Sequence, residues 1–174
     1  MGTNGSGKTT LAKSIIAAKG LKEIQAGKNR IQISNDGKTI LLGKYDGVGC
    51  GGCDTINTKD EIKNLIAGAI RKKAETIIYE GVIISGNFTL AKEVKKLAET
   101  CKYDFLVIWM DRDLDICLNS IYERNGGKDF KIHNVYSKAR SVAATAEKMM
   151  KYGIEVKRIN PDDYTKEEIY SVCE

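Results

Sequence analysis

The chain has 174 residues, a formal net charge of +5 and a hydrophobic fraction of 42%, which suits one globular domain and excludes a disordered or fibrous chain. Neither a membrane span of roughly 20 apolar residues nor a secretory signal pattern is visible, so we expect a cytoplasmic protein whose five cysteines are thiols. The mild positive charge is compatible with nucleic acid as a partner and does not require it.

The opening residues, MGTNGSGKTT, contain the phosphate-binding pattern G-x-x-x-x-G-K-[ST]. Its glycines allow backbone N–H groups to turn toward phosphate oxygens, while Lys8 is expected to bridge the β- and γ-phosphates and Thr9 to bind Mg²⁺. A helix is expected from Lys8 to Lys19, ended by Gly20, and its positive N-terminal end favours the same phosphates. The residues expected to bind ATP are Gly2, Asn4, Gly5, Ser6, Gly7, Lys8, Thr9 and Thr10.

The loop lacks the strand from which such a loop normally extends. An apolar strand of about five residues usually leads into the first glycine, and here only Met1 precedes Gly2. We therefore expect an incomplete N-terminus with a truncated first strand, from a shortened chain or a start placed at an internal methionine, and the alternative is that another segment fills the gap. The two strands beside it should then remain unpaired, with part of the core open.

The next part of the chain begins with a hairpin pattern. Apolar residues alternate on both sides of an Asn-Asp-Gly turn within residues 30–42, which predicts two antiparallel strands. A glycine- and cysteine-rich loop follows, GKYDGVGCGGCDTI. Thr58 and Glu61 then have the spacing of a capping box, which predicts a helix that runs to about Lys73.

The remainder of the chain alternates between short apolar runs and helical patterns. Strands are expected at 76–79, 105–110 and 156–159, and helices at 89–102, 114–125, 137–152 and 165–173. This alternation predicts an α/β fold, a single domain over residues 1–174 whose mostly parallel sheet is flanked by helices and carries the inserted hairpin. Together with the phosphate loop, it is typical of P-loop proteins related to nucleoside and nucleotide kinases.

Two carboxylates follow expected strands. Glu80 comes after the strand at 76–79 and before Gly81, where open α/β sheets bind ligands. It is a candidate to orient Mg²⁺ through a water, or to take the proton of an attacking hydroxyl, with a surface glutamate as the alternative. Asp111 follows the strand at 105–110 and is a second candidate, with the cap of the next helix as the alternative.

A basic, glycine-containing segment spans about 123–140 between two expected helices. Such a segment suits a lid that closes over phosphates, excludes water and stabilises charge on the transferring phosphoryl group. Arg124 and Arg140 are the best candidates because a guanidinium binds phosphate in a fork, and Lys138 is an expected substrate contact. The alternative is a solvated, charged surface.

Cys50 and Cys53 form a C-x-x-C pattern that Asp54 follows. Such a pattern can be half of a zinc site, but the other cysteines are scattered and His133 stands alone. We favour a loop that approaches the site closely, in which Asp54 contacts the acceptor and both cysteines line the substrate site.

Several of these segments together resemble a family of phage-encoded P-loop kinases: GTNGSGKTT, GKYDGVGCGGCDTI, IIYEGVIISG, DRDLDICLNSIYER and DFKIHNVYSKARSV. The family resembles enzymes that phosphorylate 5-hydroxymethyluracil in hypermodified phage DNA, which places a phage-encoded member in the host cytoplasm. The resemblance implies Lys8 and Thr9 at ATP and Mg²⁺, Glu80 near the acceptor, Asp54 in the substrate loop, and Arg124 and Arg140 at phosphates. Residues 131–134 and 112–113 depart from the family's pattern.

We therefore expect a kinase that uses ATP and Mg²⁺ to phosphorylate a hydroxyl of a nucleotide-type acceptor, favoured as 5-hydroxymethyluracil in DNA. A flipped-out base and salt-sensitive contacts with the DNA backbone belong to this hypothesis. Two alternatives stay open: a kinase of free deoxynucleoside monophosphates, and a catalytically silent ATP-binding protein. No membrane partner is expected.

Overall fold

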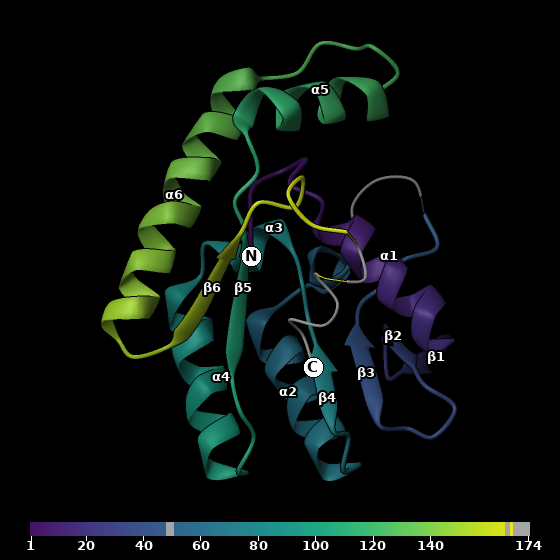
Figure 1. Ribbon diagram of the computed structural model, residues 1–174. Helices are drawn as coiled ribbons and strands as arrows, with labels where there is room; N and C mark the ends of the chain where they lie inside the picture. Colours follow the sequence, from purple (N-terminus) through teal and green to yellow (C-terminus); the bar gives the residue numbers. More distant parts are fainter. Residues whose placement is uncertain (48–50, 166–167, 169–174) are drawn as a thin grey trace.

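The computed structural model describes residues 1–47, 51–165 and 168 of the chain (Figure 1). Its elements are α1 (Lys8–Lys19), β1 (Lys22–Ala26), β2 (Asn29–Ile33), β3 (Thr39–Leu42), η1 (Cys53–Thr55), α2 (Lys59–Arg71), β4 (Thr76–Ile78), α3 (Val82–Ser85), α4 (Phe88–Thr100), β5 (Leu106–Met110), α5 (Leu114–Arg124), α6 (Ile132–Lys151) and β6 (Glu155–Ile159). Within these residues, none of the helices has the length and hydropathy that crossing a membrane requires.

The strands form two sheets, and this corrects the expectation of one mostly parallel sheet. In the first sheet, in the order β1-β2-β3-β4, β2 pairs antiparallel with both β1 and β3, and β3 pairs parallel with β4. In the second sheet, β5 and β6 are parallel. The fold is α/β, but its first sheet is mixed, because strands joined by short turns can pair only antiparallel whereas parallel pairs need a crossover connection.

The expected hairpin is confirmed as β2 and β3, whose turn is held by Asp36. The Asp36 carboxylate accepts hydrogen bonds from the Ser34 hydroxyl (2.6 Å) and the Lys38 N–H (3.0 Å). The strand β1 was not predicted, since its sequence KEIQA is charged and largely exposed. It exists because a turn at Gly27 brings it beside β2. The inserted hairpin is therefore a three-stranded meander.

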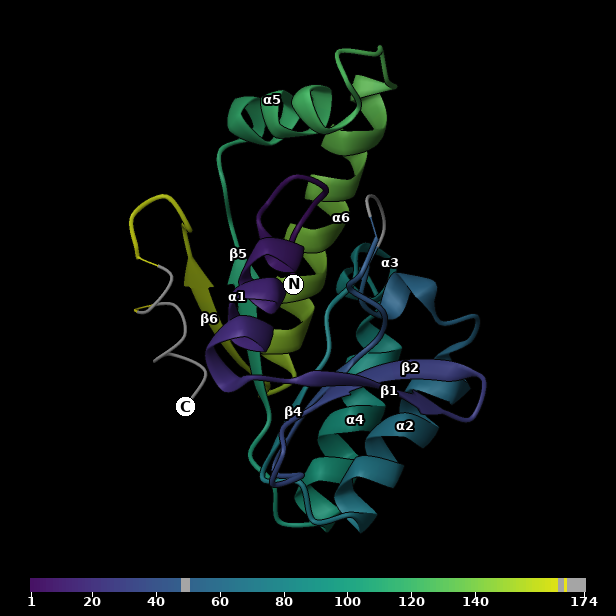
Figure 2. The same ribbon diagram turned by 90° about the vertical axis from the view of Figure 1, so that its right-hand side faces the viewer.

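Helices cover both faces of β3, which is why its residues are buried almost without alternation. Ile40 and Leu42 pack in a cluster with residues of α2 and α4, whereas Leu41 packs with Ala12 and Ile15 of α1. Figure 2 shows α1 on one side of the strands and α2 with α4 on the other. This packing fixes α1, and with it the phosphate loop, against the sheet.

The facing strands β4 and β5 do not pair with each other, and a cavity of about 820 Å³ lies along them. Apolar side chains line it, including Ile77, Leu90 and Val107. The backbone of Met1 lies against β5: its amino group donates to the Ile108 carbonyl, and its carbonyl accepts from the Met110 N–H at 2.8 Å. In the part of the chain that the structure describes, β4 and β5 therefore belong to two separate sheets, and the truncated first strand stays a prediction.

Several helix boundaries differ from those expected. The short helix α3 follows β4 and was not predicted. The helix α6 begins at Ile132 rather than at residue 137, so the second half of the expected lid is helical and the connection after α5 is confined to residues 125–131. The predicted C-terminal helix at 165–173 falls largely outside the described residues.

Candidate active site

The phosphate loop curves around the side chain of Lys8. The Lys8 ammonium donates to the Thr3 carbonyl (2.7 Å) and the Ser6 hydroxyl (3.4 Å), and the Ser6 hydroxyl itself donates to the Thr3 carbonyl (2.9 Å). Gly5 and Gly7 have positive φ values of 76° and 89°, which the curvature of the loop requires and which glycine adopts without strain. Lys8 is only 7% exposed, so its charge is held inside the loop.

The loop presents polar groups that a bound anion would satisfy. Gly7 is the N-cap of α1 and has no side chain that could cap this end, so among the described residues the first N–H groups of the helix remain available to an oxygen ligand. Asn4 Oδ1 is buried and has no hydrogen-bond partner in the described residues. Since a buried polar atom without a partner is costly, both observations fit a loop that binds a ligand.

Glu80 lies directly beside the start of α1. It follows β4, and its Oε1 accepts a hydrogen bond from the Thr9 hydroxyl at 3.3 Å. Burial raises the pKa of Glu80 above its ordinary value, against the opposing effect of the positive charge of Lys8. Burial likewise lowers the pKa of Lys8 to about 8, and the charges of Glu80 and Asp54 oppose that shift. An ammonium, a hydroxyl and a carboxylate therefore meet at the end of β4.

These groups fit a magnesium ion that is bound together with a nucleotide. Mg²⁺ prefers oxygen ligands and is usually held by only one or two side chains plus phosphate oxygens, which the Thr9 hydroxyl and the Glu80 carboxylate match. In the residues that the structure describes, no group of three or more His, Cys, Asp or Glu side chains is placed to hold a metal by itself.

The glycine-rich loop expected to approach the site covers Glu80. The Cys53 N–H donates to the Glu80 carbonyl at 2.7 Å. A Cβ atom on Gly52 would lie 2.4 Å from Glu80 Oε1, so no larger residue fits there. The buried side chain of Tyr45, which the sequence did not single out, donates its hydroxyl to the Leu42 carbonyl at 3.3 Å, and the charge of Glu80 raises the pKa of that hydroxyl in addition to the effect of burial. The close approach is confirmed, and it shields the carboxylate from water.

Asp54 caps the helix α3. Its carboxylate accepts hydrogen bonds from the N–H groups of Val82 (2.7 Å) and Ile83 (2.9 Å). Cys53 lies in the core, and burial raises the pKa of its thiol. Cys50 falls outside the described residues. The expectation that these three residues contact the substrate stays a prediction.

Two anchors, neither of them predicted, attach the first residues of the loop to the helices beside it. The Gly2 N–H donates to the Ser85 hydroxyl (3.2 Å), which in turn donates to the Gly81 carbonyl (2.6 Å). The Thr3 hydroxyl donates to the Val135 carbonyl of α6 (3.4 Å). No sequence pattern marks a serine at the end of a four-residue helix as a partner of the loop.

The basic side chains of α5 and α6 divide into two groups. Lys138 lies near the site: its charge lowers the pKa of Lys8, and its ammonium would be 3.8 Å from a Cβ atom on Gly86. Arg124 and Arg140 are exposed, and neither side chain has an ion-pair partner in the described residues. Figure 1 shows α5 and the first turns of α6 above the phosphate loop. The phosphate contacts expected for both arginines stay predictions.

Asp111 neither caps α5 nor lies free. Asp113 is the cap, because its carboxylate accepts from the N–H groups of Asp115 (2.8 Å) and Ile116 (3.3 Å). Asp111 instead pairs with Arg158 of β6, whose guanidinium lies 4.9 Å from the centre of the Trp109 ring. The cap role considered for Asp111 is therefore wrong.

Comparison with known proteins shows the family of this chain. The family model described as 5-hmdU DNA kinase matches residues 1–159. A 5-hmdU DNA kinase of Pseudomonas phage PaMx11 is 30% identical over 173 residues, which cover 92% of this chain and 88% of the relative. A 5-hmdU DNA kinase of Pseudomonas phage M6 is 30% identical over 170 residues, which cover 91% of this chain and 88% of the relative. The 5-hmdU DNA kinase 1 of Salmonella phage ViI is 29% identical over 135 residues, covering 74% and 59%. The resemblance stated from the sequence is confirmed: the chain belongs to the 5-hmdU DNA kinase family and is a kinase, a phosphotransferase.

Proposed function

We propose that this kinase uses ATP to phosphorylate the hydroxyl of 5-hydroxymethyluracil in DNA. The observation that carries the proposal is the meeting of Lys8, Thr9 and Glu80 at the end of β4, where a phosphate loop and a shielded carboxylate face one another. The names of the relatives, 5-hmdU DNA kinases of phages, support the acceptor. A phage kinase of this kind works in the host cytoplasm.

The donor phosphates lie on residues 2–10. Backbone N–H groups of the loop and of the first turn of α1 bind phosphate oxygens, and the Lys8 ammonium turns from the Thr3 carbonyl to the β- and γ-phosphates. The Thr9 hydroxyl would hold Mg²⁺, and Glu80 would help to hold it through a water. When bound, the ion would neutralise charge on the phosphates. The unpartnered Asn4 Oδ1 supports a ligand at this loop.

Glu80 is the base that receives the acceptor proton. The acceptor oxygen forms a bond with the γ-phosphorus while the bond from that phosphorus to the bridging oxygen breaks, ADP leaves with the bridging oxygen, and the proton passes to the carboxylate. Burial raises the pKa of Glu80, and a base is most effective when its pKa lies near the working pH. The loop over Glu80 keeps competing water away from the phosphoryl group.

The basic side chains beside the site bind the two anionic substrates. Lys138 is close enough to influence Lys8, so it stabilises charge on the phosphoryl group or on the backbone next to the acceptor base. Arg124 and Arg140 are exposed and have no ion-pair partner among the described residues, and they become phosphate contacts when α5 and α6 approach the loop. A base within a duplex must leave the stack to reach Glu80.

The test uses γ-labelled ATP and Mg²⁺ with DNA that contains 5-hydroxymethyluracil, unmodified DNA and a panel of free deoxynucleoside monophosphates. We expect label in the modified DNA alone, and a loss on the order of a hundredfold or more in Lys8→Ala and Glu80→Ala. Lys13→Ala is the matched control, since Lys13 is an exposed lysine on the same helix. Label in a free monophosphate instead would identify a nucleotide-pool kinase, and ATP binding without transfer to any acceptor would identify a silent ATP-binding protein.

A further inference from the structure

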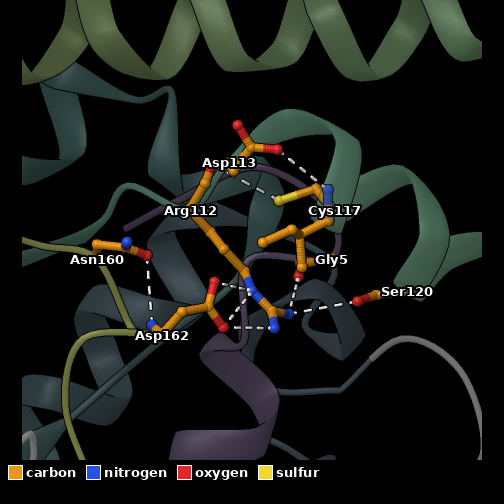
Figure 3. Close-up of polar contacts among 8 residues, drawn as sticks. Gly5, Arg112, Asp113, Cys117, Ser120, Asn160 and Asp162 are labelled. Atoms are coloured by element: carbon orange, nitrogen blue, oxygen red, sulfur yellow. Dashed lines mark hydrogen bonds and ion pairs between the residues drawn. The ribbon is translucent and has the colours of Figure 1, made fainter.

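The guanidinium of Arg112 connects the phosphate loop with two other segments of the chain (Figure 3). Its Nε lies 2.9 and 3.1 Å from the two carboxylate oxygens of Asp162, and its Nη2 lies 2.7 Å from Asp162 Oδ1. Its Nη1 donates to the Gly5 carbonyl and to the Ser120 hydroxyl, both at 3.3 Å. The loop after β6, the helix α5 and the phosphate loop are therefore connected through one side chain.

The pair of Arg112 and Asp162 is well placed to hold a fixed geometry. The two side chains are 22% and 34% exposed, and their forked contact is the geometry that restrains an arginine most strongly. The hydrogen bonds to Asp162 raise the pKa of Arg112, and the same bonds lower the pKa of Asp162. Asp162 is itself restrained, because its N–H donates to the Asn160 side-chain oxygen at 3.3 Å.

Gly5 is confined on its other side by α5. A Cβ atom on Gly5 would lie 2.4 Å from the Cys117 carbonyl oxygen, and its φ of 76° is one that larger residues rarely adopt. The middle of the phosphate loop therefore lies between the backbone of α5 and the Arg112 guanidinium. The Cys117 thiol lies 3.9 Å from the Arg112 carbonyl, so the same turn of α5 contacts both residues.

Fixing the Gly5 carbonyl has a consequence for the next N–H group. The peptide bond is planar, and in its trans form the carbonyl oxygen and the following N–H point in opposite directions. Because Arg112 holds the Gly5 carbonyl outward, the Ser6 N–H is directed toward the inside of the loop. There the Ser6 nitrogen lies 3.4 Å from the Thr3 carbonyl oxygen. Inward N–H groups are what such a loop offers to phosphate oxygens.

We propose that Arg112, held by Asp162, is a positioning residue that keeps the phosphate loop in its phosphate-binding conformation. This inference rests on the proposed binding of ATP at that loop. Arg112 acts through the Gly5–Ser6 peptide and does not itself touch the reacting atoms. Replacing Arg112 should therefore weaken the binding of the nucleotide phosphates while the chain stays folded.

The test measures binding of ATP and of adenosine by calorimetry, and the KM for ATP and kcat, in Arg112→Met, Arg112→Lys and Asp162→Asn. We expect Arg112→Met to weaken ATP binding on the order of tenfold, which matches the loss of one hydrogen bond from a charged donor, and to raise KM more than it lowers kcat. Adenosine binding should be unchanged. Arg112→Lys should fail to restore ATP binding, since an ammonium cannot contact Asp162 in a fork and reach Gly5 as well. Asp162→Asn should show part of the loss.

The matched control is Arg158→Met, which removes another arginine–aspartate pair between the ends of β5 and β6, a pair whose side chains make no hydrogen bond to the phosphate loop in the described residues. ATP binding within twofold of wild type in both Arg112→Met and Asp162→Asn, or an equal loss in Arg158→Met, would overturn the inference. Equal losses for ATP and adenosine would overturn it too, because they indicate general unfolding. A wild-type chain that binds no ATP would instead overturn the proposed function, and the inference with it.

Discussion

The close approach of Gly52 to Glu80 makes Gly52 a sensitive position in the active site. Its φ is 62°, and a Cβ atom there would lie 2.4 Å from Glu80 Oε1 and 2.5 Å from the Glu80 carbonyl oxygen. Gly27 has the same φ of 62°, but apart from its chain neighbours no described residue places an atom within 4 Å of the position of its Cβ. Alanine strains the backbone at both positions, and at Gly52 a ψ of −145° adds to the strain because that combination of φ and ψ is essentially restricted to glycine. Only Gly52→Ala also displaces the carboxylate.

The two variants differ in their effect on the carboxylate. A left-handed conformation costs a non-glycine residue about 1 to 2 kcal/mol, so Gly27→Ala should lower the free energy of unfolding by about that amount. Gly52→Ala should cost at least about 1 to 3 kcal/mol more, because its overlap with Glu80 adds to a larger backbone strain. Because a misplacement of about 1 Å in an active site can reduce the rate about a hundredfold, Gly52→Ala should lower kcat by about that factor, whereas Gly27→Ala should leave kcat unchanged.

Denaturant unfolding and steady-state kinase assays on both variants check these values. The measurements are made at a temperature at which both variants remain folded, so that stability does not enter the rate. Equal kcat values for Gly52→Ala and Gly27→Ala would refute the reasoning. That result would mean that the loop shifts away from Glu80 without consequence, and that Glu80 is not held in place by its contact with Gly52.

Three further predictions concern charge. The binding of ATP should weaken as the pH rises through the Lys8 pKa of about 8, because the ammonium is lost, and an affinity that stays constant above that pH would contradict the role of Lys8. Turnover should fall as the pH decreases through the raised pKa of Glu80, since the protonated form cannot accept a proton, and Glu80→Gln should lower kcat about 10² to 10⁴-fold with ATP affinity retained in direct binding measurements. Lys138→Ala should reduce the slope of log K against log salt for binding of duplex DNA by about 0.9, and an unchanged slope would exclude a contact between Lys138 and a DNA phosphate.

Local sequence signals determined the parts of this protein that depend on neighbouring residues. The phosphate-loop pattern was visible because its glycines and Lys8 lie at fixed, short spacings in the sequence. The helix α1 runs from Lys8 to Lys19 as predicted, with Gly20 in the left-handed conformation that ends it. Thr58 begins α2 as expected, by accepting the Glu61 N–H. The hairpin of β2 and β3 follows from its turn residues in the same way.

Contacts between distant segments were decided only by the tertiary structure. A strand end indicated Glu80 as a candidate, but its hydrogen bond with Thr9 exists because β4 and α1 pack on the same sheet. Asp54 was expected at the acceptor and is found as the cap of α3, a helix too short to leave a periodic pattern. Two further features, the separation into two sheets and the hydrogen bond from Arg112 to Gly5, depend on which strand edges and loops lie side by side in space. Short-range patterns of hydrophobicity and turn residues carry no information about such long-range contacts.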